Sequence, residues 1–182
     1  MKEKYDLMND EPVIRTYTGK WVNVFDPTSD ITDMFDILDI AHALSMQCRF
    51  SGHLKHFYSV AQHSIECYRQ ANIQGLNKKE QLTALMHDCS EAYLVDIPRP
   101  IKREFAQYKV IEDKLMNTLS KVFNFNYPLS SRIHDIDNLL LQMEWDMLMI
   151  NRDDISQLSR IHVYSQKYTE ELFLDIFSDL TK

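Results

Sequence analysis

The chain has 182 residues, of which 45% are hydrophobic, and this is enough for one domain with a core of ordinary size. It has only three glycines and five prolines, and this scarcity of turn formers argues against a fold of many strands. The formal net charge of −7 argues against a protein that grips duplex nucleic acid through a basic face, but it is compatible with a small anionic ligand.

The N-terminal part of the chain is expected to hold a short hairpin and one helix. In residues 13–25, β-branched and aromatic residues flank Gly19, a pattern typical of two short strands joined by a turn. Apolar residues then recur at helical spacing over residues 37–44, until Ser51 and Gly52 interrupt the pattern. No later segment has a strong strand pattern, so the remaining elements are predicted to be helices.

Two capping signatures open the central helices. Residues 59–62 (S-x-x-Q) and 77–80 (N-x-x-E) have the spacing at which a polar side chain binds a free N–H of the first turn. The first helix is expected to run to about Gln70. The second carries an apolar stripe through Tyr93 and must end before Pro98, because proline interrupts the helical hydrogen bonds.

Three further helices are predicted, at roughly 109–123, at 132–150 and around 172–177. The second of these is expected to bury Ile136, Leu139, Leu140, Met143 and Met147. There is no repeat or linker, so the sequence predicts a single all-α domain over residues 1–182, with its motifs at about 30–150.

The cysteines and the N-terminus indicate the compartment. Cys48, Cys67 and Cys89 form no C-x-x-C pair and are odd in number, as expected for reduced, buried thiols. Met1 to Lys4 lack the apolar region of a signal peptide, and no apolar run approaches the roughly 20 residues that a membrane helix needs. We therefore expect a soluble cytoplasmic protein with no membrane partner.

His87 and Asp88 lie within an apolar stripe, next to Met86 and Cys89. A charged aspartate in such a place is costly unless it is paired or bound to a metal ion. Side chains of adjacent helix residues diverge by about 100°, yet both can reach one ion at the helix edge. Taken alone, a His-Asp pair is more often a hydrogen-bonded pair in the core than a metal site.

Two further candidates strengthen the metal interpretation. His63 lies on the preceding predicted helix, which a short loop would bring beside His87. Asp137 has apolar neighbours at helical spacing, whereas Asp135 has polar ones, so Asp137 is expected to face inward. Two imidazoles and two carboxylates suit one divalent transition metal ion (Zn, Co or Mn), which would lower the pKa of a water molecule and make it a nucleophile.

Four segments carry a family resemblance: C-R-F-S-G-H (48–53), F-Y-S-V-A-Q-H-S (57–64), L-M-H-D-C-S-E-A-Y-L-V-D-I-P-R-P-I-K (85–102) and I-D-N-L (136–139). Together they resemble the HD superfamily of metal-dependent phosphohydrolases, in the branch that includes bacterial 5′-deoxynucleotidases and a phage dATP triphosphohydrolase. The resemblance covers roughly residues 17–150 and implies an HD-domain helical bundle that forms homo-oligomers. It also implies the metal ligands His63, His87, Asp88 and Asp137.

Two acidic residues near the proposed ligands are candidates for catalysis. Glu91 is four residues after His87 and would share its helix face, which suits a general acid or base; the alternative is a solvated surface glutamate. Asp96 either caps the next turn or orients the attacking water or the sugar. The resemblance favours the functional interpretation of both.

Several other residues are candidates for binding substrate. Arg49 and Lys102 are expected to bind phosphate, in preference to Arg99. His53 belongs to a family-like Gly-His motif and is expected to contact phosphate. Trp21 either stacks on a base or lies half-buried in the hairpin.

The sequence therefore predicts metal-dependent hydrolysis of phosphate from (deoxy)nucleotides. The enzyme would be a dNTP (dATP-type) triphosphohydrolase or a dNMP 5′-nucleotidase. One alternative is an HD phosphodiesterase that acts on a cyclic or hyperphosphorylated nucleotide. Another is a nucleotide-binding regulator without turnover, although an intact Glu91 argues against it, because binding alone needs no proton-transfer residue there.

Overall fold

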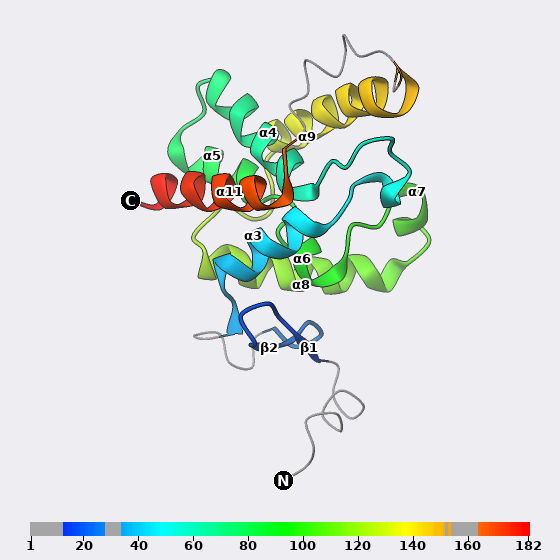
Figure 1. Ribbon diagram of the computed structural model, residues 1–182. Coiled ribbons are helices and arrows are strands. Elements are labelled where there is room, and N and C mark those ends of the chain that lie inside the picture. The colour runs from blue at the N-terminus through cyan, green and yellow to red at the C-terminus, as the bar shows by residue number, and fades with distance from the viewer. Residues whose placement is uncertain (1–12, 28–33, 152, 154–163) are drawn as a thin grey trace.

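The computed structural model describes residues 13–27, 34–151, 153 and 164–182, which form a mostly helical fold with a small N-terminal hairpin (Figure 1). Strands β1 (Val13–Arg15) and β2 (Trp21–Asn23) pair antiparallel, as the sequence predicted. Helix α3 (Ile37–Met46) follows. Its buried Asp39 accepts hydrogen bonds from the backbone N–H and the hydroxyl of Thr18, at 2.6 and 2.8 Å, and so fastens the hairpin turn to the helix.

Helices α4 (Val60–Ile73) and α5 (Lys78–Met86) pack side by side, joined by a short loop. Both predicted caps are present. The Ser59 hydroxyl accepts a hydrogen bond from the N–H of Gln62. Asn77 and Glu80 form a complete capping box, in which each side chain accepts from the other residue's backbone N–H. These local signals therefore set where the two central helices begin.

The predicted helix through Tyr93 is interrupted. α5 ends at Met86, residues 87–90 form a turn, and the short helix α6 (Glu91–Leu94) follows. Within the turn, the N–H of Cys89 donates to the carbonyl of Met86 and that of Glu91 to the carbonyl of Asp88, both across three residues. These tighter contacts replace the α-helical pattern, and they let adjacent side chains turn toward one point.

The remaining elements are a 3-10 helix at Phe50–Gly52, α7 (Arg99–Lys102), α8 (Ala106–Val122), α9 (Ser131–Glu144), a π-helix at Trp145–Ile150 and α11 (Gln166–Thr181). The prediction that Leu139 and Met143 are buried was wrong, since they are 44% and 45% exposed. Helix α9 packs one narrow face on α4, and the buried apolar residues of that face are Ile133, Ile136 and Leu140.

The main core lies among α3, α4, α5, α8 and α11. Its fully buried apolar side chains include Ile40, Leu44, Ile65, Leu85, Leu119 and Phe173. Val22 and Val24, from β2 and the turn after it, extend this core toward the hairpin. No helix in the described part of the chain is long and apolar enough to span a membrane.

Candidate metal centre

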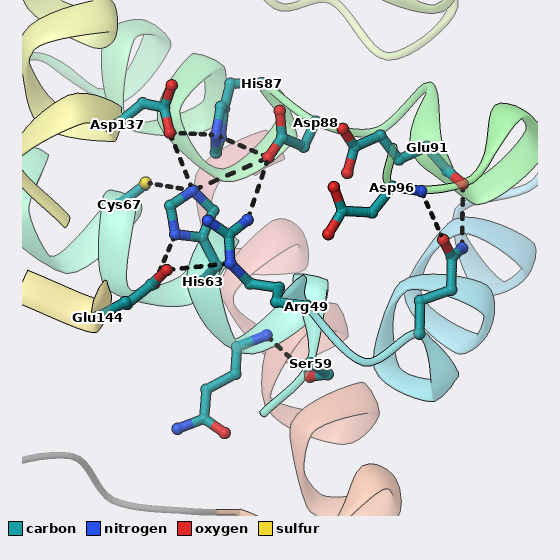
Figure 2. Close-up of polar contacts among 12 residues, drawn as sticks. Arg49, Ser59, His63, Cys67, His87, Asp88, Glu91, Asp96, Asp137 and Glu144 are labelled. Carbon is teal, nitrogen blue, oxygen red and sulfur yellow. Dashed lines mark hydrogen bonds and ion pairs between the residues drawn. The ribbon is translucent and has the colours of Figure 1, made fainter. Parts of the chain in front are cut away.

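The four predicted metal ligands come from three parts of the chain and converge (Figure 2). His63 comes from α4, His87 and Asp88 from the turn after α5, and Asp137 from α9. The Nε2 atom of His63 is 3.2 Å from Oδ1 of Asp137 and 3.8 Å from Oδ2 of Asp88. Nε2 of His87 lies 3.1 and 3.9 Å from Asp88 Oδ2 and Asp137 Oδ1. Ligands of one tetrahedral ion with ordinary bond lengths lie about 3.3–3.6 Å apart, so these separations suit a shared cation.

Both imidazoles are oriented by their other nitrogen. His87 Nδ1 is 2.8 Å from the carbonyl of Ala84, and His63 Nδ1 is 2.7 Å from Oε1 of Glu144. Because a carbonyl or carboxylate oxygen only accepts, each Nδ1 donates, and in the neutral form of each ring the Nε2 lone pair points toward the centre. His87 Nε2 is buried and has no hydrogen-bond partner among the described residues. This arrangement is typical of metal-binding histidines, so the residues fit a divalent transition metal ion.

Cys67 adds a donor that the sequence analysis treated only as a buried thiol. Its Sγ lies 3.6 Å from Nε2 of His63, and the donor atoms of His63, Cys67 and His87 all lie within 4.8 Å of one another. All three residues are buried, and together they could hold a metal ion. The signal was the spacing of four residues between His63 and Cys67, which puts both on one face of α4.

Glu144 is the principal residue that the sequence analysis missed. It is only 3% exposed, and it accepts hydrogen bonds from Nδ1 of His63, Nε of Arg49 and the hydroxyl of Tyr58. Burial would raise the pKa of Glu144, but the nearby His63 and Arg49 outweigh it and lower the pKa. A signal was present, because Glu144 follows Asp137 by seven residues and so lies on the same face of α9.

The centre favours positive charge. Burial tends to lower the pKa of His87, but the carboxylate of Asp88, the thiol of Cys67 and the carboxylate of Asp137 raise it to about 10. Burial would raise the pKa of Asp88, yet His87, His63 and Arg49 lower it. The groups thus stabilise one another's charged forms, and a divalent cation would neutralise the same carboxylates.

Glu91 and Asp96 lie beside this centre (Figure 2). Glu91 is 6% exposed, its Oε2 is buried without a hydrogen-bond partner among the described residues, and its Oε1 lies 3.8 Å from Nζ of Lys102. Burial raises the pKa of Glu91 well above its ordinary value, and the carboxylates of Asp88 and Asp96 raise it further. A carboxyl group with a raised pKa is suited to act as a general acid or base.

A cavity of about 1640 Å³ opens onto the centre, and most of the candidate site residues line it: Arg49, His53, His87, Asp88, Glu91, Asp96, Lys102 and Asp137. His63 is fully buried and does not line the cavity. The candidate phosphate-binding cations already have acidic partners. Arg49 pairs with Glu144, and Nζ of Lys102 lies 2.5 Å from Glu112.

Arg99, which the sequence analysis ranked below Arg49 and Lys102, has the most direct contact with a proposed ligand. Its Nη2 lies 2.6 Å from Oδ2 of Asp137, and its Nη1 lies 2.7 Å from Oδ1 of Asn138. Arg99 thus holds one oxygen of Asp137 while the other oxygen faces the histidines. Asp135 is exposed, as its polar neighbours predicted.

Trp21 does not line this cavity. It lies half-buried on β2, where the guanidinium of Arg15 lies 5.6 Å from its ring centre. The sequence left open whether Trp21 stacks on a base or lies half-buried in the hairpin, and the structure agrees with the second interpretation. The aromatic residues that line the cavity beside Arg49 are Phe50 and Trp145, whose ring centres are 6.0 Å apart.

Comparison with known proteins adds the family. No family model matches the chain. The chain is 38% identical over 131 residues to the uncharacterized protein YfdR of Escherichia coli (strain K12), a match that spans 72% of this chain and 69% of YfdR. It is 35% identical over 108 residues to an uncharacterized protein of Rhodobacter capsulatus, over 56% of this chain and 53% of that protein. The extent and identity of the first match show that the chain belongs to the same family as YfdR.

Proposed function

We propose that the chain is a metal-dependent phosphohydrolase of the HD superfamily that removes phosphate from (deoxy)nucleotides. The observation that carries this proposal is the convergence of His63, His87, Asp88 and Asp137 beside the buried carboxyl group of Glu91, at the wall of one cavity. A site that only binds nucleotide needs no buried acid next to its metal ligands. Catalysis therefore explains this arrangement better than nucleotide binding alone.

The proposed cofactor is one divalent transition metal ion, Zn, Co or Mn, held by His63, His87, Asp88 and Asp137. Such an ion would polarise a phosphoryl oxygen and lower the pKa of a water molecule. Glu144 keeps the ring of His63 in place through its Nδ1, and partners of this kind usually matter for metal affinity. Cys67 is the alternative donor at the buried side of the centre.

Glu91 and Asp96 would handle the proton and the water. Oε2 of Glu91, which has no hydrogen-bond partner among the described residues, is available to give a proton to a leaving oxygen or to take one from water. Asp96 lines the same cavity, and burial raises its pKa as well. Its carboxyl group would orient the attacking water or contact the sugar.

The cations of the cavity would bind the phosphoryl oxygens. Arg49 precedes Glu91 in the sequence and Lys102 follows it, and both side chains line the cavity. Their contacts with Glu144 and Glu112 hold their side chains in place and leave other N–H groups for an anion. His53 lies at the exposed wall of the same cavity. Fixed donors of this kind stabilise the charge that develops in the transition state.

The substrate would be a small nucleotide. Ordinary ligand pockets have volumes of about 300–1,000 Å³, and the cavity of about 1640 Å³ can accommodate a base, a sugar and several phosphates. Within this class, a dNTP triphosphohydrolase and a dNMP 5′-nucleotidase are both compatible with the open cavity. The product distinguishes the two.

The test is a panel of mono-, di- and triphosphate nucleotides, with cyclic and hyperphosphorylated nucleotides included. Each is incubated with protein loaded with Co²⁺, Mn²⁺ or Zn²⁺, and the products are separated by chromatography. We expect inorganic phosphate from a monophosphate or triphosphate from a dNTP, and no product from Asp137→Asn. Nucleotide binding without any product from the loaded protein would contradict the proposal and favour a regulator.

A further inference from the structure

The backbone between Glu91 and Asp96 passes through an unfavourable conformation. Val95, the C-cap residue of the short helical turn α6, has φ 69° and ψ 145°, close to a region of positive φ that glycine alone adopts readily. Its side chain is 59% exposed, so tertiary packing gives little compensation. Its N–H donates to the carbonyl of Glu91, which closes the turn. Another contact must therefore hold this turn in place.

The side chain of Gln47 supplies that contact. Its Nε2 donates to the carbonyl of Glu91 at 3.0 Å, and its Oε1 accepts from the N–H of Asp96 at 3.1 Å. A side-chain amide is suited to this bridge because it carries a donor and an acceptor together. Gln47 is itself anchored, because its carbonyl accepts from the N–H of Val60 and its own N–H donates to Ala43. The bridge thus ties the turn to the frame of α3 and α4.

We infer that Gln47 is a positioning residue that holds Glu91 and Asp96 at the cavity wall. The inference rests on the proposed function, which gives these two acids their roles. Without the bridge, Val95 would relax toward an ordinary extended conformation, and the following Asp96 would move with it. Glu91, at the start of α6, would lose one of the two hydrogen bonds that its carbonyl accepts. The reacting groups would then be misplaced although none had been removed.

The test compares Gln47→Leu, which removes both hydrogen bonds, with Gln107→Leu on the exposed surface of α8 as a matched control. A small misplacement of catalytic groups can reduce rates by about 10²-fold, so we expect kcat of Gln47→Leu to fall by roughly that factor, with a smaller change in KM. Metal content should be unchanged. Gln47→Glu keeps the acceptor for the Asp96 N–H but loses the donor to the Glu91 carbonyl. Its kcat should therefore lie between the kcat of the wild type and that of Gln47→Leu.

The same substitution in a Val95→Gly protein tests whether the strained conformation of Val95 is the reason that the Gln47 bridge is needed. Glycine adopts positive φ without strain, so Val95→Gly should need the bridge less. We expect Gln47→Leu to reduce kcat by a smaller factor in Val95→Gly than in the wild type. Equal factors in both backgrounds would overturn the link between Gln47 and the turn.

Amide hydrogen exchange gives a readout that does not depend on activity. The N–H of Asp96 is bonded to Gln47 and should exchange faster in Gln47→Leu than in Gln107→Leu. Unchanged exchange would overturn the bridge. Faster exchange with kcat unchanged would overturn the positioning role and leave a merely structural contact. If the wild-type protein hydrolyses no nucleotide, the proposed function fails, and the exchange of Asp96 still decides whether the bridge exists.

Discussion

At the scale of single residues, the buried charges around Glu144 explain how the centre is held. Arg49, Tyr58 and His63 each donate a hydrogen bond to this carboxylate, and they lie 81 to 95 residues before it in the chain. A buried carboxylate with charged and hydrogen-bonding partners can remain ionised, as the lowered pKa of Glu144 indicates. The hydrogen bond from Nδ1 therefore fixes the orientation of the His63 ring.

Glu91→Gln separates an enzyme from a binding protein. The glutamine keeps the shape of the side chain but cannot transfer a proton. Because general acid–base catalysis contributes about 10²–10⁴-fold, turnover should fall by roughly that factor. Metal content and substrate affinity should hardly change, because the lost interaction belongs to the transition state. Loss of the metal would instead identify Glu91 as a ligand, and near-normal turnover would exclude it from the mechanism.

Cys67→Ser tests which donors complete the metal site. If Asp88 and Asp137 complete it, Cys67→Ser should still bind one Co²⁺ per chain, whereas Asp137→Ala should bind it much more weakly. Metal analysis after dialysis measures the stoichiometry. In the wild-type Co²⁺ protein, the near-ultraviolet spectrum should then lack a thiolate-to-metal charge-transfer band. Such a band, absent from Cys67→Ser, would show that the thiol is a ligand.

At the scale of elements, Asp39 on α3 joins the hairpin to the helices. Its two carboxylate oxygens accept from the N–H and the hydroxyl of Thr18, across 21 residues. The hairpin has only two strands and would be marginally stable alone. Its attachment to α3 and the burial of Val22 in the main core account for its place in the fold.

Asp39→Ala should therefore destabilise the protein. Hydrogen bonds to a charged group are worth about 1.5–3 kcal/mol each, and the loss leaves the Thr18 N–H without its acceptor. We expect the free energy of unfolding, measured by urea titration, to fall by about 2–4 kcal/mol. Asp175→Ala, at an exposed position of α11, is the control and should have little effect. Equal stability of the two variants would show that the hairpin does not depend on this contact.

At the scale of the whole molecule, the proposed metal site and the core are largely separate. The core is apolar and continuous among α3, α4, α5, α8 and α11, whereas three proposed ligands, His87, Asp88 and Asp137, line the cavity at its edge. Among the four proposed ligands, only His63 is fully buried. The fold should therefore persist without the ion, unlike small domains that depend on a metal to fold. Light scattering would test the expectation that the chain forms a homo-oligomer.

Asp88→Ala provides the test of this separation. The change removes one proposed ligand, and the variant should lose metal binding while its far-ultraviolet circular dichroism stays close to that of the wild type. Removal of the ion from the wild-type protein by a chelator should likewise leave the helical signal. An unfolded variant or an unfolded apoprotein would contradict the separation and make the site structural as well as catalytic.

Much of this protein was determined locally, by side chains within four residues of one another. Ser59 and the pair Asn77 and Glu80 set helix starts because a cap needs only the first turn. The apolar neighbours of Asp137 likewise predicted its inward face, because residues three and four apart share a helix surface. The His-Asp pair stood out because charge in an apolar stripe is costly.

Only the tertiary structure decided the rest, because it depends on contacts between distant segments. Glu144 is buried because Arg49 and His63 reach it from other elements, and nothing in its own neighbourhood identifies these partners. The same holds for Gln47, which contacts Asp96 across 49 residues. Leu139 looked like a core residue by periodicity but faces outward, since packing against α4 uses only one narrow face of α9. Sequence periodicity indicates which residues share a face, whereas the neighbouring elements determine which face is covered.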